Sequence, residues 1–136
     1  MPDDDRRALI GVIEKAPFAI ALGLEIESAE NGGAVVRMPF NQPLLTDAGP
    51  TAAVHGGAIA ALADVAACAA VWSLTETVRS ATISMTVNYT GFATESDLVA
   101  RARVRRKGKR IASLSVEIAD ASGALVADAL VTYKIA

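Results

Sequence analysis

His55, Gly56 and Gly57 open an alanine-rich stretch, AIAALADVAACAAVW, that holds an acid, Asp64, nine residues after the histidine. Alanine is a strong helix former, so the stretch predicts one long helix from about His55 to Trp72. Backbone N–H groups in the first turn of a helix lack intrahelical partners, and the helix dipole adds partial positive charge there. A ligand carbonyl could therefore approach the unshielded Gly57 amide and be polarised. The two glycines are equally consistent with a tight connection into the helix.

Asp64 lies in the middle of the predicted helix, in the most apolar segment of the chain. An unpaired carboxylate is costly in such surroundings, so it usually has a partner or a chemical role. A helix face that meets water or a backbone donor would also explain it. The residue types alone leave these two explanations about equally open.

The spacing of His55 and Asp64 constrains how the two could cooperate. Nine residues are about two and a half helical turns, so the side chains lie on opposite faces, roughly 13 Å apart along the axis. If both serve one site, the second must come from another subunit. A two-fold dimer with antiparallel helices would form two such shared sites.

The remaining chain predicts strands around this helix. Residues 4–15 are expected to form a short amphipathic helix with an Asp4 or Asp5 cap and with Leu9, Val12 and Ile13 facing inward. A hairpin follows from Leu22 to Phe40, with its turn at Asn31–Gly33. Four segments then alternate apolar and polar residues and are joined by short turns. They cover residues 80–91, 97–106, 110–120 and 124–135.

A single long apolar helix must be covered by a curved antiparallel sheet, so we expect an α+β fold with five or six strands. Simple alternation in the first of the four late strands would put Ile83 beside Met85 and Val87, and Thr82 beside Ser84 on the other face. The length of 136 residues fits one domain spanning residues 1–136.

Composition and charge exclude several classes of protein. The formal net charge of −2 gives no general attraction to nucleic acid. Asp64 and the Gly56–Gly57 pair argue against a membrane span in the apolar stretch. The acidic N-terminus does not resemble a secretory signal, and one cysteine, Cys68, cannot form an internal disulfide. We therefore expect a cytoplasmic protein without membrane or nucleic-acid partners, in which Cys68 fills space in the core.

Three segments together resemble the hotdog-fold thioesterases of the PaaI (phenylacetic acid degradation) type. They are APFAIALGLEI, VHGGAIAALAD and the long C-terminal run RKGKRIASLSVEIADASGALVADALVTYKI. The resemblance covers nearly the whole chain. It implies hydrolysis of acyl-coenzyme A thioesters by a homodimer or a dimer of dimers, with coenzyme A as part of the substrate and with no cofactor or metal.

The resemblance also implies roles for particular residues. The Gly57 amide would polarise the thioester carbonyl, with Gly56 beside it, and Asp64 of the neighbouring subunit would act as nucleophile or general base. His55 would help to fix the thioester end or the loop. A hydroxyl on the strand after the helix often assists the acid. Thr82 holds that position, with Ser84 as second choice.

The chain departs from the family pattern at Gly49, where related enzymes often carry Asn six residues before the histidine. An altered substrate or lower activity would follow if that Asn orients the site. A hotdog protein that binds acyl-CoA without turnover is therefore an alternative, as is a purely structural dimer. A hydratase on the same fold would need a different His and acid pattern, which the chain lacks.

The segment RVRRKGKR is the most basic in the chain. Arg106, Lys107 and Lys109 stand at the predicted hairpin tip and could hold the phosphates of coenzyme A. A solvated turn explains each of them equally well. The segment lacks interleaved aromatic residues, so it does not predict nucleic-acid binding.

Overall fold

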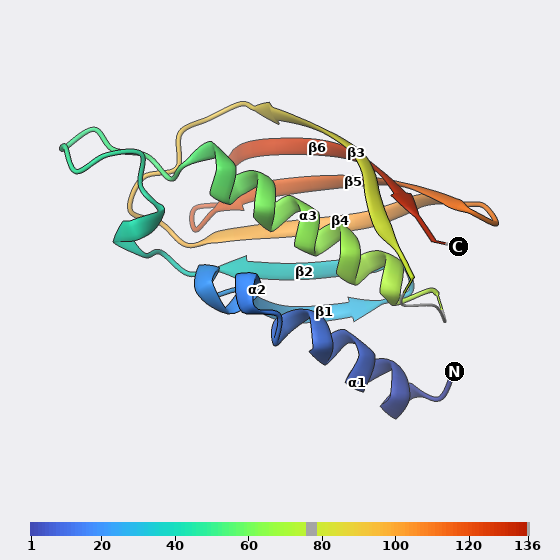
Figure 1. Cartoon of the computed structure of the whole chain (residues 1–136). Coiled ribbons are helices and arrows are strands. Elements are labelled where there is room, and N and C mark those ends of the chain that lie inside the picture. The colour runs from blue at the N-terminus through green and yellow to red at the C-terminus, as the bar shows by residue number, and fades with distance from the viewer. Residues whose placement is uncertain (76–78, 136) are drawn as a thin grey trace.

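The long helix α3 (Gly56–Trp72) lies in the concave side of a curved antiparallel sheet, in a computed structural model that describes residues 1–75 and 79–135 (Figure 1). Six strands form the sheet within these residues, in the order β1-β2-β4-β5-β6-β3. Their bounds are β1 Glu25–Glu30, β2 Gly33–Met38, β3 Ala81–Tyr89, β4 Leu98–Lys107, β5 Ile111–Asp120 and β6 Leu125–Lys134. The α+β hotdog fold expected from the sequence is confirmed.

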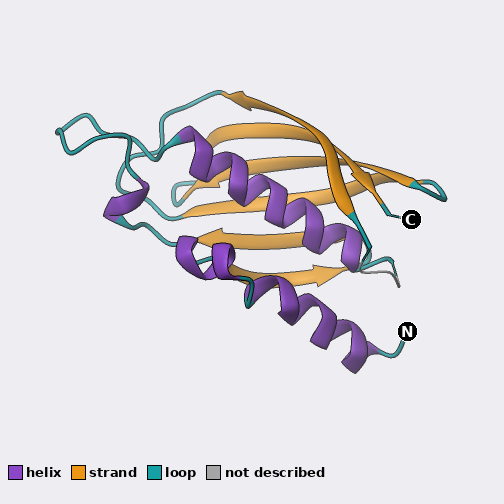
Figure 2. Ribbon diagram, in the orientation of Figure 1, coloured by secondary structure: helices purple, strands orange, loops and turns teal. Residues whose placement is uncertain are grey.

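Alanine allows the sheet to wrap closely around α3 (Figure 2). The helix buries residues on several of its sides, because small side chains let neighbouring strands approach its backbone. The buried set is Ile59, Leu62, Ala63, Ala66, Ala67, Ala69, Ala70 and Val71. Within the described residues, no helix combines the length and apolarity needed to cross a membrane.

The hairpin turn was predicted correctly from two residues. Asn31 and Gly32 both have positive φ angles, 52° and 79°. Such a pair closes a two-residue hairpin whose twist matches the flanking strands. β1 and β2 are therefore joined directly, and β2 goes on to pair with β4.

The N-terminal elements differ from the expectation. α1 (Asp3–Glu14) forms and buries Ile13 as predicted, but no aspartate side chain caps it. Val12 is 56% exposed, and Ile10 packs against the core in its place. A short helix, α2 (Pro17–Leu22), was not predicted; it lies between α1 and the predicted hairpin and includes Leu22, the first residue expected in that hairpin. Proline is well placed in a first helical turn, and the helix ends at Gly23 with φ 71°.

β3 follows α3 in the chain but lies at an edge of the sheet. It pairs with β6 at one edge of the sheet and is separated from β4, the next strand in sequence. The pairing of β3 with β6 is irregular between Thr82 and Ser84, so Ile83 is an extra residue in a bulge. Thr82 therefore faces the same side as Met85, and the predicted grouping of Ile83 with Met85 is wrong.

The packing of α3 predicts that a large-to-small substitution on its buried side will strongly destabilise the protein. Leu62 is 0% exposed, so Leu62→Ala should lower the free energy of unfolding by about 2–5 kcal/mol. Leu130, which is 62% exposed on β6, is the matched control. Leu130→Ala should change the free energy of unfolding by less than about 0.5 kcal/mol. Urea denaturation of both variants measures the difference. Equal losses would show that α3 is not packed as described.

Candidate active site

The beginning of α3 is capped by the side chain of His55. Its Nδ1 accepts a hydrogen bond from the Gly57 amide at 2.8 Å, and its backbone N–H donates to the Leu44 carbonyl at 2.6 Å. Both His55 and Gly57 are exposed. A ligand carbonyl that accepts from the Gly57 amide must therefore share that amide with the imidazole or displace it.

Gly56 is covered from the sheet side by Tyr89, a contact that the sequence analysis did not anticipate. The Tyr89 hydroxyl donates to the Gly56 carbonyl at 2.8 Å. A Cβ at position 56 would lie 3.3 Å from ring atoms of Tyr89, so even alanine would crowd the ring. The ring is 53% exposed, which leaves an aromatic surface beside the first turn of α3.

Asp64 is half-buried and has the partner that its apolar surroundings require. Thr82 donates a hydrogen bond from Oγ1 to Asp64 Oδ1 at 2.5 Å. The bulge at Ile83 makes this contact possible, because it turns Thr82 toward the helix. Ser84 follows the bulge and lies opposite Thr132, on the outer face of the sheet. The two hydroxyl residues proposed from the sequence are therefore on different faces.

A second group of polar side chains lies one helical turn beyond Asp64. Tyr133 is 5% exposed, and its hydroxyl lies near the side chains of Cys68 and Ser80. Trp72 Nε1 donates to Ser80 Oγ at 2.7 Å. Burial raises the pKa of Tyr133 far above its usual value and also raises the pKa of the Cys68 thiol. Both groups therefore stay protonated near neutral pH, which agrees with the expectation that Cys68 is not a nucleophile.

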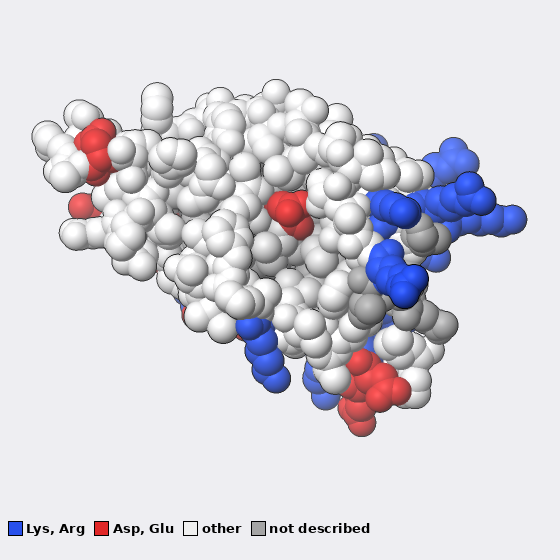
Figure 3. Space-filling model, in the orientation of Figure 1, with Lys and Arg blue, Asp and Glu red and all other residues white. Residues whose placement is uncertain are grey.

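One strip of α3 is not covered by the chain's own sheet. Gly57 is exposed, and Ala60, Ala61, Asp64 and Cys68 along the same strip are partly exposed. Gly57 and Asp64 are seven residues apart, nearly two whole turns, so they share one face about 10 Å apart along the axis. The face seen in Figure 3 is largely uncharged, with an acidic group near its middle and Lys and Arg gathered at one end. Such an apolar face around a carboxylate is suited to a ligand or a second protein surface.

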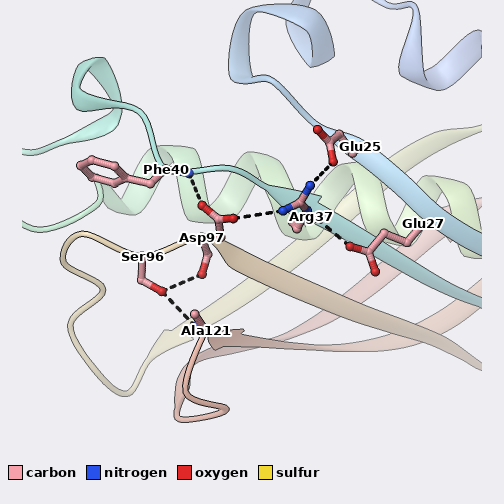
Figure 4. Close-up of polar contacts among 7 residues, drawn as sticks. All are labelled: Glu25, Glu27, Arg37, Phe40, Ser96, Asp97 and Ala121. Atoms are coloured by element: carbon pink, nitrogen blue, oxygen red, sulfur yellow. Dashed lines mark hydrogen bonds and ion pairs between the residues drawn. The ribbon is translucent and has the colours of Figure 1, made fainter.

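The loop between β2 and α3 is anchored to the sheet by Asp97 (Figure 4). Its carboxylate accepts from the Phe40 amide at 2.7 Å and pairs with Arg37 at 3.1 Å. Arg37 also pairs with Glu25 and Glu27, and its hydrogen bond to Glu25 raises its pKa. These contacts fix the beginning of the loop that leads to the helix start.

The far end of that loop folds on itself. The Gly49 amide donates to Asp47 Oδ1 at 2.6 Å, and Gly49 is exposed. The Val54 amide donates to the Ala93 carbonyl at 2.7 Å, which ties the end of the loop to the segment after β3. Position 49, where related enzymes often carry Asn, therefore lies at the tip of a loop held at both ends.

The basic residues are separate from this site within the chain. Arg106, Lys107 and Lys109 are exposed around the β4–β5 turn, and no contact links them to His55 or Asp64 among the residues that the structure describes. Within the same described residues, no three His, Cys, Asp or Glu side chains gather as metal ligands would.

A curved sheet around one helix, with an acid in the middle of that helix and exposed glycine at its start, is shared by a class of known proteins. Residues 52–127, more than half of the chain, match the sequence model of the thioesterase superfamily. The chain belongs to that superfamily, and within it resembles the PaaI-type hotdog thioesterases.

Individual relatives cover most of the chain. It is 31% identical to the medium/long-chain acyl-CoA thioesterase YigI of Salmonella typhimurium, over 88% of this chain and 85% of the relative. It is 35% identical to the putative esterase VNG_1336C of Halobacterium salinarum, over 85% and 78% of the two chains. The solved structure of the E. coli PaaI protein is similar with a TM-score of 0.85, 25% identity and coverage of 96% and 91%.

The hydrogen bond from Thr82 to Asp64 predicts a loss of thioester hydrolysis when the hydroxyl is removed. Thr82→Val should lower kcat about 10- to 100-fold, because a hydrogen bond to a charged group is lost, whereas Thr82→Ser should retain most of the activity. Thr86, exposed on the same strand, gives the control Thr86→Val. Steady-state kinetics with a thiol-detecting reagent measures all three variants. An undiminished kcat in Thr82→Val would remove this hydroxyl from the reaction.

Proposed function

We propose that the protein is an acyl-CoA thioesterase that hydrolyses its substrate to a free acid and coenzyme A. The observation that carries the proposal is the Thr82-bound carboxylate of Asp64, which shares the uncovered strip of α3 with the Gly57 amide. The partly exposed side chains of Ala60 and Ala61 on the same strip suit an apolar acyl group. The similarity to YigI, named as an acyl-CoA thioesterase, supports this choice of thioester.

The active site is shared between two subunits. Gly57 and Asp64 are equally far along the helix from the point between Ala60 and Ala61, and all four lie on the uncovered strip. A two-fold axis at that point, with two antiparallel α3 helices, brings Gly57 of one subunit level with Asp64 of the other. Alanines at the crossing point let the helices approach closely. The outer edge of β3, where Ile83 is 55% exposed, extends the surface available for this dimer.

The reaction follows from these two groups. The substrate carbonyl accepts a hydrogen bond from the Gly57 amide, and this amide stabilises the negative charge that develops on the oxygen. Asp64 either attacks the carbonyl carbon and expels the coenzyme A thiolate, which leaves a mixed anhydride that water then hydrolyses, or takes a proton from a water molecule whose oxygen attacks the carbon and expels the thiolate. Thr82 holds the carboxylate in position for either route. His55, released from the Gly57 amide, lies beside the thioester end.

The nucleotide end of coenzyme A is held by the basic turn between β4 and β5. Its phosphates carry several negative charges. Arg106, Lys107 and Lys109 are exposed and form no ion pair with an acidic side chain among the described residues. Figure 3 shows Lys and Arg side chains gathered at this end of the molecule. Their contribution would be to substrate affinity, which salt weakens.

A non-catalytic acyl-CoA-binding protein is the second candidate. Two observations favour it: His55 already accepts from the Gly57 amide, and Gly49 stands where related enzymes often have Asn. Such a protein would bind coenzyme A thioesters and release them unchanged. Binding without turnover over a full substrate panel would decide for this candidate.

The proposed activity is tested by a panel of acyl-CoA thioesters that spans short, medium, long and aryl acyl groups. We expect at least one to be hydrolysed, and Asp64→Asn to lower its kcat by at least about 100-fold, because the amide can neither attack nor accept a proton. Asp128→Asn, on the outer face of β6, is the matched control and should leave kcat unchanged. Hydrolysis by Asp64→Asn at the wild-type rate would exclude the proposed role of Asp64.

Mixed dimers test whether the site is shared. In a dimer of one Asp64→Asn chain with one Gly57→Pro chain, a shared arrangement leaves one site with both native groups, because proline removes only its own amide donor. We expect about half of the wild-type activity from the purified mixed dimer and almost none from either parent. A site built within one chain predicts an inactive mixed dimer. Circular dichroism checks that each parent is folded.

A further inference from the structure

Gly56 and Gly57 are joined by the peptide group whose N–H is proposed to bind the substrate carbonyl. The other end of this same peptide group is the Gly56 carbonyl oxygen, and the Tyr89 hydroxyl donates a hydrogen bond to it at 2.8 Å. No peptide bond among the described residues is cis. In a trans peptide group the C=O and N–H bonds lie in one plane and point in opposite directions. Tyr89 therefore holds one end of the peptide group while the other end points away from the tyrosine.

The N–H end of this peptide group also has a partner. The Gly57 amide donates to His55 Nδ1 at 2.8 Å. Tyr89, the peptide group and His55 thus form a chain of two hydrogen bonds, with a hydroxyl donor at one end and an imidazole acceptor at the other. Hydrogen bonds in such a chain polarise one another, so donation to the Gly56 oxygen makes the Gly57 N–H a stronger donor.

Glycine at position 56 lets the tyrosine reach the backbone. A Cβ there would lie 3.3 Å from two ring carbons of Tyr89 and 3.4 Å from its hydroxyl oxygen. A carbonyl oxygen has two lone pairs, so it can accept from Tyr89 as well as from the amide one turn further along the helix. Gly56 therefore makes room for the side chain that donates to its own carbonyl.

β3 contacts both groups of the proposed site. Thr82, near the beginning of the strand, donates to Asp64, whereas Tyr89, its last residue, donates to the first residue of α3. In the proposed dimer, the acid and the amide of one chain belong to different sites. The role of Tyr89 can therefore be tested separately from the role of Thr82.

We infer that Tyr89 is a positioning residue for the amide donor: its hydroxyl orients and polarises the Gly56–Gly57 peptide group, which strengthens the hydrogen bond from the Gly57 N–H. Tyr89 acts through the peptide group and transfers no proton. Its effect is greatest in the transition state, where the substrate oxygen carries the most charge. The inference rests on the proposed function for its kinetic consequence, whereas the effect on the amide can be measured without substrate.

Tyr89→Phe keeps the ring over Gly56 and removes only the hydroxyl. We expect kcat to fall about 2- to 10-fold while KM changes less than twofold, because one neutral hydrogen bond that acts on the transition state is lost. Thr86→Val, which removes a hydroxyl from the outer face of the same strand, is the control and should leave kcat unchanged. An unchanged kcat in Tyr89→Phe, or a loss confined to KM, would overturn the inference.

Mixed dimers show through which group Tyr89 acts. A dimer of one Asp64→Asn chain with one chain of native Asp64 keeps one working site, built from the Gly57 amide of the first chain and the carboxylate of the second. Tyr89→Phe on the first chain should lower the activity of this dimer about 2- to 10-fold, and on the second chain should leave it unchanged. In an enzyme with shared sites, the opposite result would mean that Tyr89 acts through the strand that carries Thr82. Equal losses from both placements would mean a purely structural role, and either result would overturn the inference.

The imidazole of His55, the one histidine of the chain, provides a readout without substrate. The 15N resonance of its Nδ1, recorded at alkaline pH so that the ring is neutral, reports how strongly the Gly57 amide donates. We expect this resonance to move in Tyr89→Phe towards the value of an imidazole nitrogen that accepts no hydrogen bond, and to stay in place in Thr86→Val. A shift in a protein that hydrolyses no thioester would uphold the role of Tyr89 and reject the thioesterase. An unmoved resonance in an active enzyme would reject the role of Tyr89 and uphold the thioesterase.

Discussion

The structure depends on one constraint: the sheet and α1 pack against α3 but leave uncovered the strip that carries Asp64. Alanine makes this wrapping close, because a helix of small side chains can be approached from several directions. A strip left uncovered on so apolar a helix exposes surface that would be stabilised by contact with a second apolar surface. A carboxylate on that strip then lies in a poorly hydrated place once the strip is covered. The incomplete burial of α3 and the reactivity proposed for Asp64 have the same origin.

The bulge at Ile83 gives the uncovered strip of α3 a hydrogen-bonding partner for Asp64. In a regular strand Thr82 and Ile83 would alternate, and Thr82 would point to the outer face with Ser84. The extra residue turns Thr82 inward, so a hydroxyl meets Asp64 where an isoleucine side chain would otherwise lie. Polar contact at this point offsets the cost of keeping a charge on an apolar helix face. Bulges are common where a sheet must aim a side chain at a site.

Most of the fold could be predicted from short sequence patterns. The alanine run predicted α3, the Asn31–Gly32 pair predicted the first hairpin, and alternation with short turns predicted β4 to β6 in order. The edge position of β3 was not predictable in this way, because short turns identify only strands that are consecutive in the chain. The segment of α2 is too short and apolar to show a helical period, so no helix was predicted there.

The site was predictable in its residue types and less so in its contacts. Asp64 and Thr82 were singled out correctly as a pair, yet no glycine or proline marks the bulge that joins them. Tyr133 has the pattern of an ordinary core residue on the last strand. Only the β3–β6 register, a long-range pairing, brings it opposite Thr82. The alternation of apolar and polar residues within one strand does not reveal which residues of a distant strand lie opposite. The β3–β6 register brings Tyr133 beside the helix face that holds Asp64.

The hydrogen bond between His55 and the Gly57 amide can be reconciled with a catalytic role for that amide on energetic grounds. A side-chain cap at a helix start stabilises a protein by about 1 kcal/mol. A donor to a developing oxyanion typically stabilises the transition state by about 3–4 kcal/mol. Since His55 is exposed, its imidazole can turn into solvent at little further cost. If the Gly57 amide acts as proposed, His55 satisfies it in the empty site and gives it up as negative charge develops on the carbonyl oxygen, because the hydrogen bond to that charge is the stronger one.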